Sequence, residues 1–419
     1  MLSSSRKNIG SRSNRPPSPP RAVPGALGLL AGLVGTLCCG SAVAAISDTV
    51  HPFVAVTYSH DDNLLRRGDG PPVDVAPRGD NLKQVQAGLS FERPIGRQIL
   101  SGEAKWSKVS FDHYDEFNYD GKDFLAALEW HVANHVEGHL GASYNQTLTP
   151  FTDFQQAERN LRVQHREYVD AAWRFHPSWR VRGGVTRDRF SYDLPSQRFN
   201  ERTELATEGG LDYLAASGSR VGVQLRKLKG SYASRRAVGT LLVDNDYDQN
   251  EVKANIYWNY SGITQLQLLG GWVERKHAFL TLRDASGFNA RAVVTYAPTG
   301  KLRFTGSGWR EFGVVESTLV NNSLNNGASL AAVYAASAKV SVNASVRREQ
   351  RDFSGLSGVV LPDDASDSTR STTLGLSYQP HRAVTLGASL SRDVRDGSAI
   401  IGTGSYRANV VSFNASAQF

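Results

Sequence analysis

The sequence predicts an all-β protein, a transmembrane, antiparallel, up-and-down outer-membrane β-barrel of about 18 strands, with 16 strands as the alternative count. Three observations predict this fold class. Apolar and polar residues alternate with period two in segments of about ten residues. Short turns alternate with long polar connections between those segments, and the N-terminal segment has the pattern of an export signal. We expect the barrel to occupy residues 46–419.

Residues 1–45 have the features of a secretory signal peptide, with a single anchoring helix as the alternative. A basic region without acidic residues precedes an apolar stretch at 26–37, and small residues at 42–45 form an A-x-A-like cleavage site. Removing this segment takes away Met1, both cysteines and five of the 47 basic residues, which leaves 42 basic against 40 acidic residues. The formal charge of +7 therefore does not indicate nucleic acid as a partner.

Composition excludes other classes of protein. Outside the N-terminus, no stretch approaches the roughly 20 apolar residues of a spanning helix, which excludes a polytopic helical membrane protein. The only two cysteines are the adjacent Cys38 and Cys39, so neither a disulfide scaffold nor a cysteine zinc site is expected. We expect no cofactor and no bound metal.

Alternating segments follow one another along the whole mature chain. In the last segment, Phe413, Ala415, Ala417 and Phe419 share one face, and small polar residues share the other. The same pattern recurs at residues 85–91, 124–130, 136–144, 221–225, 252–260, 340–346, 372–378 and 384–390. One apolar and one polar face is the pattern of a strand that separates lipid from a wet interior.

Two kinds of connection alternate between these segments. Short turns lie near residues 93–96, 133–134, 176–178, 216–219, 261–262, 298–300, 337–338 and 379–381. Long polar connections lie near residues 61–80, 111–119, 147–160, 192–201, 233–246, 276–287, 313–326, 353–368 and 395–404. Eight short turns separate nine hairpins, which gives 18 strands. A propeller is not favoured, because each blade of a propeller contains four strands.

The outward face of such a barrel meets acyl chains, and closure satisfies every backbone hydrogen-bonding group. Aromatic residues at segment ends, such as Trp130, Trp173 and Tyr378, suit the interfacial girdles. Phe413 and Phe419 match an outward aromatic signal for the barrel-assembly machinery. We therefore expect outer-membrane lipids and that machinery as partners.

Inward positions carry mixed charge, which favours a wet lumen of porin size over an ion-pair network in a closed barrel. Pairing across strands is expected for some of them. The expected lumen charges are Glu103, Lys105, Glu137, His139, Asp170, Arg174, Glu251, Lys253, Arg291 and Arg303.

Two long connections mix aromatic rings with carboxylates, a combination that suits sugar contact, although strand-end girdle positions would explain the same rings. The candidate glycan-contact residues are Tyr114, Phe117, Tyr119, Phe151 and Phe154. No catalytic residue is predicted, because no Gly-x-Ser-x-Gly elbow occurs and His135 and His139 lie about 13 Å apart along one strand. Acidic runs at 61–63 and 244–246 fit Asx turns better than Ca²⁺ sites.

The segment Tyr58-Ser59-His60-Asp61-Asp62-Asn63-Leu64-Leu65-Arg66 resembles the Tyr-x-x-Asp-Asn-x-x-x-Arg motif of outer-membrane barrels encoded in exopolysaccharide operons with exosortase systems, the EpsL type. Residues 91–98, 117–121, 152–154, 159–160 and 175–180 are also similar, and the resemblance is best over residues 50–230. It implies a porin-like barrel of exopolysaccharide biosynthesis and export, with the polysaccharide and other export components as partners. A lipid- or glycan-modifying barrel enzyme and a glycan-binding adhesin barrel are the alternatives.

Overall fold

The computed structural model describes residues 50–68, 77–152, 156–238, 241–279, 284–314, 322–354, 365–398 and 404–419, without the side chains of 236–243, 314, 322 and 354. The predicted signal segment, residues 1–45, lies outside the described residues. Within the described part, no helix is long and apolar enough to cross a membrane.

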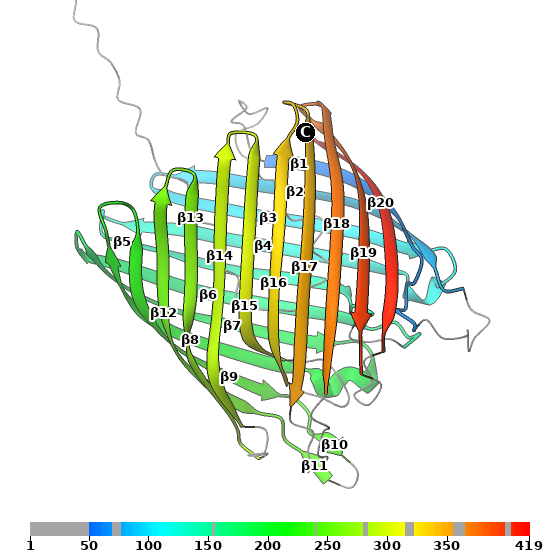
Figure 1. Ribbon diagram of the computed structural model, residues 1–419, viewed down its shortest axis with the longest axis horizontal. Coiled ribbons are helices and arrows are strands. Elements are labelled where there is room, and N and C mark those ends of the chain that lie inside the picture. Colours follow the sequence, from blue (N-terminus) through cyan, green and yellow to red (C-terminus); the bar gives the residue numbers. More distant parts are fainter. Residues whose placement is uncertain are drawn as a thin grey trace, which may run out of the picture.

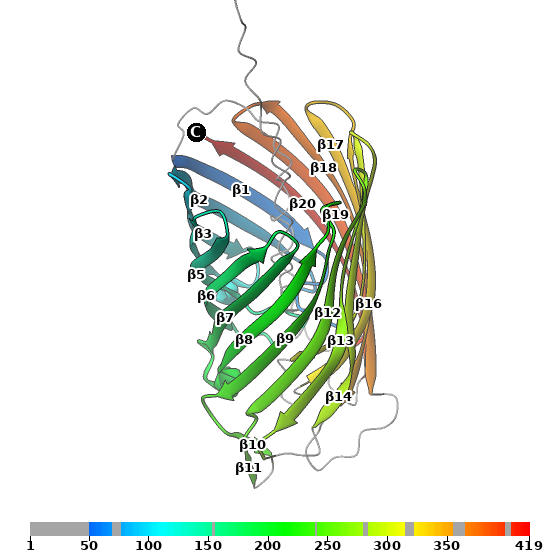
Figure 2. The ribbon, with the colours of Figure 1, turned by 90° about the vertical axis from the view of Figure 1, so that its left-hand side faces the viewer.

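The fold is a closed antiparallel barrel of 18 strands, as the sequence predicts (Figure 1). Each barrel strand pairs with its neighbours in chain order, and pairing of β1 with β20 closes the barrel. The strands are strongly tilted, and the wall curves round on itself (Figure 2). The barrel strands are β1 (Val50–Asp61), β2 (Asp80–Ile95), β3 (Gln98–Phe111), β4 (Tyr119–Val132), β5 (Val136–Leu148), β6 (Leu161–His176), β7 (Trp179–Tyr192), β8 (Arg202–Leu214), β9 (Arg220–Tyr232), β12 (Tyr247–Ser261), β13 (Thr264–His277), β14 (Ala285–Thr299), β15 (Leu302–Val314), β16 (Asn322–Ala335), β17 (Val340–Ser354), β18 (Ser366–His381), β19 (Val384–Asp396) and β20 (Tyr406–Gln418).

The period-two alternation sorts residues to the two faces of the wall. Val56 pairs with Val85 on one side and with Ala415 on the other, so these three side chains share a face. Val56 is 52% exposed and Val85 is 59% exposed, which identifies this face as the outer one. An outer face of exposed aliphatic side chains is what a lipid environment requires.

The eight predicted short turns join strands at one end of the barrel, the turn end, and the long connections lie at the other, the loop end. Gly96 and Gly218 occupy positive φ angles of 64° and 80° in two of these turns, where the absence of a Cβ removes the steric penalty. Ala133 takes φ 52° in a third. Outward aromatic pairs at the turn end, such as Trp258 and Tyr260 with ring centroids 5.3 Å apart, form the predicted girdle.

The long connections contain more structure than their composition indicates. Two short 3-10 helices, η1 (Asp115–Phe117) and η2 (Pro195–Asn200), lie in the connections after β3 and β7. The segment that we expected to be a plain polar loop near residues 233–246 contains a small hairpin, β10 (Arg236–Val238) and β11 (Leu241–Val243). Strands of three residues are too short to show alternation in a sequence.

Candidate functional site: the lumen and its loop end

The inner wall over β6–β9 and β12 carries a network of buried ion pairs, which we call the charged wall. Its centre is Asp212 on β8, whose carboxylate is fully buried. Arg180, Arg182 and Arg220 approach it to 2.9, 3.4 and 4.0 Å. Arg180 and Arg182 also lie 3.3 and 3.9 Å from Glu137 and Glu208, so guanidinium and carboxylate groups share partners over this part of the wall.

A second buried carboxylate on the charged wall belongs to Glu251 on β12. Lys253 lies 2.6 Å and Arg226 lies 3.2 Å from it. Arg275 extends the network by donating a 2.7 Å hydrogen bond to Gln249, which also bonds to Glu251. Because each buried charge has an opposite charge or a hydrogen-bond partner, the network can exist inside the wall at moderate cost.

The inner wall over the adjacent strands β17–β20, β1 and β2 is different, and we call it the neutral wall. Its inward residues carry mainly hydroxyl and amide groups in the middle and turn-end parts of these strands. Charged inward side chains lie toward the loop end, beginning with Arg347 and Asp393 opposite Ser371, and Glu92 lies at the turn end of β2. Ser389 pairs with Ser412, which pairs in turn with Ser59, and the hydroxyls of Ser412 and Ser59 are 3.0 Å apart. The inward polar residues are Thr57, Ser59, Gln84, Gln86, Ser90, Ser341, Asn343, Ser345, Thr369, Ser371, Thr373, Ser377, Thr385, Ser389, Ser391, Ser412, Asn414 and Ser416.

The indole ring of Trp309 lies beside the neutral wall, in contact with charged side chains. Trp309 on β15 points inward and is 7% exposed, with the guanidinium groups of Arg347 and Arg291 at 4.2 and 5.5 Å from its ring centroid. Its indole Nε1 donates a 3.0 Å hydrogen bond to Glu349. The ring lies over Gly327, directly opposite on β16, where an added Cβ would lie 2.3 Å from a ring carbon. This glycine therefore provides the space for the ring.

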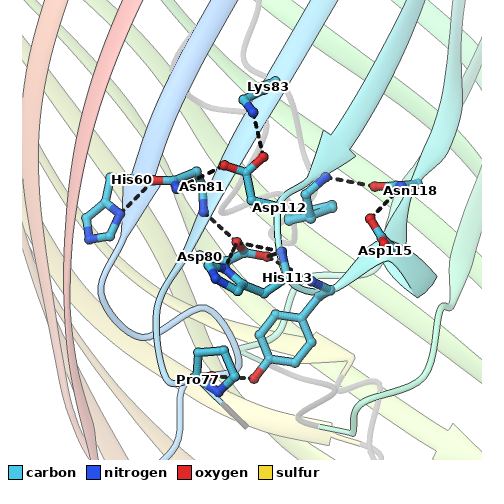
Figure 3. Close-up of polar contacts among 11 residues, drawn as sticks. His60, Pro77, Asp80, Asn81, Lys83, Asp112, His113, Asp115 and Asn118 are labelled. Carbon is cyan, nitrogen blue, oxygen red and sulfur yellow. Dashed lines mark hydrogen bonds and ion pairs between the residues drawn. The ribbon is translucent and has the colours of Figure 1, made fainter.

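At the loop end, the start of β2 holds the connection that follows β3 (Figure 3). The buried Asp80 carboxylate accepts hydrogen bonds from the backbone N–H groups of His113 and Tyr114, both at 3.1 Å, and lies 2.9 Å from His113 Nδ1. Asp112 lies 2.6 Å from Lys83 and accepts a 3.1 Å bond from Asn81. The hydrogen bond from Lys83, followed by that from Asn81, lowers the pKa of the Asp112 carboxyl below its ordinary value.

Aromatic rings from several connections pack together at this end, and we call them the inner aromatic cluster. Phe117 has no exposed surface, and its ring centroid lies 5.0 Å from that of Phe151, 5.4 Å from Tyr114 and 5.9 Å from Phe111. Phe111 ends β3 with its side chain inward, so the cluster lies inside the barrel wall. The apolar contacts fix the connections after β3 and β5 to each other.

One contact carries the connection after β5 across to a distant part of the wall. Arg395 on β19 donates a 2.6 Å hydrogen bond to the carbonyl oxygen of Thr152. In barrel order, β4, β3, β2, β1 and β20 lie between β5 and β19. Arg395 is 2% exposed and is held by the fully buried Asp367, which also lies 2.8 Å from Arg351. The connection after β5 therefore crosses part of the lumen at its loop end.

The first-strand motif forms a local structural unit. Arg66 is 4% exposed and its guanidinium lies 2.7 Å from Asp61, while the backbone N–H of Asn63 donates a 2.9 Å bond to Asp61 Oδ1, as in an Asx turn. Asn63 donates from its side chain to the carbonyl of Arg407 on β20 at 2.8 Å. The motif thus fastens the first connection to the strand that closes the barrel. Asp246 N–H likewise donates to Asp244 Oδ1 at 3.0 Å.

The structure places the predicted lumen charges as follows. Lys105 lies 3.6 Å from Glu103 and 2.9 Å from Asp123, His139 lies 2.7 Å from Asp170, and Glu137 lies 3.3 Å from Arg180. Arg291 lies 2.6 Å from Glu311. The strand registers place these groups on the inward face of the wall. The same holds for Glu251, Lys253, Arg174 and Arg303. Arg174 lies with Glu137 and Arg180 beside the short turn after β4.

The structure places four of the five candidate glycan-contact residues, and Phe154 lies outside the described residues. Tyr114, Phe117 and Phe151 are buried in the inner aromatic cluster, and Tyr119 packs against it. Stacking on a sugar needs an open ring face, and the three buried rings have none in this conformation. Glycan contact at these rings stays a prediction that requires the cluster to open. Phe413 and Phe419 are 56% and 61% exposed, and recognition by the assembly machinery also stays a prediction.

Sequence reasoning missed several residues that organise the lumen. The predicted lumen charges were chosen as charged residues at inward positions of the alternating strands. The same criterion would have selected Asp212, Arg180, Asp367 and Arg395. No sequence signal indicated that Thr152 and Arg395 are partners. Within the described residues, no group of three or more His, Cys, Asp or Glu side chains gathers as a metal site would require.

An apolar outer face, an aromatic girdle at the turn end and a polar, charge-lined interior define the class of this protein: it is a porin-like outer-membrane β-barrel. The model of the family described as Putative beta-barrel porin 2 matches residues 244–419, from the segment before β12 through the last strand. No curated protein matches the sequence.

Among solved structures, the chain is similar to the Pseudomonas aeruginosa protein OccK5 (OpdH), with a TM-score of 0.47 and 11% identity over 88% of this chain and 98% of that one. It is similar to Acinetobacter baumannii OccAB3, with a TM-score of 0.47 and 10% identity over 88% and 99%. A mutant of the ferric enterobactin receptor PfeA from Pseudomonas aeruginosa gives 0.43 and 9% over 89% and 81%. Likeness of this degree carries no information about what passes through the barrel.

Proposed function

We propose that this barrel is a conduit for exopolysaccharide across the outer membrane. The observation that carries the proposal is the neutral wall, because hydroxyl and amide side chains can exchange hydrogen bonds with sugar hydroxyls along the length of the strands. Conduction requires contacts that are numerous and individually weak, and uncharged groups meet that requirement better than buried ion pairs do. The first-strand resemblance supports a polysaccharide as the permeant.

The charged wall contributes to the same function by a different route. Its groups are paired with one another, so they hold the wall rigid without presenting a single strong binding site for a sugar. A hydroxyl-rich chain would therefore move along the neutral wall while the charged wall keeps the lumen hydrated.

Single-channel recording in planar bilayers tests the conduit. We expect the purified barrel to conduct ions, and we expect a neutral oligosaccharide to interrupt the current. Replacing Ser389 by Asp places a charge on the neutral wall and should shorten these interruptions, whereas Ser143→Asp, on an inward position opposite Arg166, should leave them unchanged. A barrel that conducts no ions would contradict the proposal.

Secreted polysaccharide in a strain that lacks the protein provides the cellular test. We expect export to fall, to be restored by the wild-type chain and to be restored less well by the Ser389→Asp variant. Unchanged export with altered cell attachment would instead support an adhesin barrel.

A further inference from the structure

Four arginines lie on the outer face of neighbouring strands at the loop end, and we call them the outer arginine patch. They are Arg348 on β17, Arg370 on β18, Arg392 on β19 and Arg407 on β20, and all four are exposed. Arg348 lies directly opposite Arg370, and both Arg370 and Arg407 pair with Val394 on the strand between them. The patch spans three strand spacings, about 14 Å.

The patch begins where the apolar band of these strands stops. Arg348, Arg370 and Arg392 share the face of exposed Val346, Leu374 and Leu390, which are 51%, 51% and 55% exposed. Arg348 is two residues beyond Val346, and Arg392 is two residues beyond Leu390. A long cationic side chain at this depth reaches the level of lipid headgroups.

The same strands are different at their turn end. Outward side chains there include Tyr378, Leu386 and Phe419, which are 42%, 41% and 61% exposed. Long connections are extracellular and short turns periplasmic in barrels of this class. The arginines therefore face the outer leaflet, and the inner leaflet meets aromatic and aliphatic groups.

Within the described residues, the protein does little to neutralise Arg348, Arg370 and Arg392. Like charges directly opposite each other on a sheet face are destabilising, as for Arg348 and Arg370. Among the described residues, the side chains of Arg348 and Arg392 have no ion pair or hydrogen bond. Arg370 lies 3.8 Å from Asp396, and both side chains are more than half exposed, so that pair contributes little. Asp62, in the same region, is bonded to Asn409 instead.

We propose that the outer arginine patch binds the phosphate groups of a phosphorylated, acylated glycolipid of the outer leaflet. Guanidinium groups bind phosphate oxygens in two parallel hydrogen bonds, and one phosphate between Arg348 and Arg370 would remove their repulsion. The acyl chains of the same lipid would lie along Val346, Leu374 and Leu390. The site is on the outer face and does not depend on what the lumen conducts.

Native mass spectrometry of the full-length barrel in detergent micelles tests the proposal with three probes: bisphosphorylated lipid A, the same lipid without phosphates, and inorganic phosphate. We expect retention of the phosphorylated lipid alone. The triple variant Arg348→Ala, Arg370→Ala, Arg392→Ala should bind it about tenfold more weakly or worse. Arg407 is left unchanged because it lies on β20, the strand that closes the barrel against β1.

The matched control is Arg187→Ala with Arg189→Ala, two outward arginines at the loop end of β7, where Glu167 lies 3.9 Å from Arg187. We expect this variant to retain the lipid. Equal losses in both variants would overturn a specific patch in favour of general basic attraction, and equal binding of the lipid without phosphates would overturn phosphate recognition. Binding of inorganic phosphate alone would overturn the lipid as the ligand. The heat-modifiable shift on gels verifies that each variant is folded.

Discussion

The guanidinium of Arg395 donates a hydrogen bond of 2.6 Å to the carbonyl of Thr152, a residue 243 positions earlier in the chain. The contact joins the connection after β5 to β19, with five strands between them in barrel order, and the buried Asp367 orients the guanidinium that makes it. A single side chain therefore helps decide how far a connection extends over the lumen.

Replacing Arg395 by Gln should loosen this contact and raise the single-channel conductance, with more noise in the open state. The physical reason is that a neutral amide loses both the ion pair with Asp367 and the reach to Thr152. Planar-bilayer recording measures the effect. Arg310→Gln, an outward position on β15, is the matched control, and equal conductance in all three proteins would contradict the expectation.

Gly327→Ala should displace the Trp309 ring, because the added Cβ would lie 2.3 Å from a ring carbon. We expect a loss of about 1–3 kcal/mol in the free energy of unfolding, the usual cost of overpacking, together with a changed tryptophan emission. Gly306→Ala is the control, since an added Cβ there meets nothing within 4 Å. Urea unfolding in lipid vesicles measures both, and a neutral Gly327→Ala would show that the ring moves freely.

Asp212→Asn should destabilise the barrel by about 3–5 kcal/mol, the cost of leaving a buried ion pair broken. It would leave Arg180, Arg182 and Arg220 without their shared carboxylate and should shift the lumen toward anion selectivity. The reversal potential in a KCl gradient reports the selectivity. Glu167→Gln removes an outward carboxylate that is 65% exposed and should change neither quantity.

The Asp112 carboxyl should titrate below its ordinary value of 3.8, because Lys83 and Asn81 hydrogen-bond to its charged form. A depressed folded-state pKa means that the contribution of this group is present above the unfolded value and is lost as the pH falls through the folded value. Carboxyl NMR of specifically labelled protein measures the titration. In Lys83→Met the pKa should return toward 3.8, and an unchanged value there would assign the shift to another group.

Much of the fold could be predicted because barrel strands have a local signature. Each strand separates lipid from water, so alternation, aromatic ends and the order of short and long connections were enough to expect 18 strands and to sort charges by parity. The hairpin β10–β11 was not predictable, because three-residue strands carry no period. The burial of Phe117 and Phe151 was not predictable either, since rings in a polar connection look the same whether they are exposed or packed together.

The sequence by itself determined which residues face lipid and which face the lumen, because that choice depends only on position along a strand. The tertiary structure alone decided which lumen groups meet: Thr152 with Arg395, and three arginines with Asp212. Closing the barrel sets strand stagger and brings distant connections to one opening, and those contacts depend on distances that no local pattern encodes. Arg348, Arg370, Arg392 and Arg407 lie on four consecutive strands, and the register between those strands brings them into one outer surface.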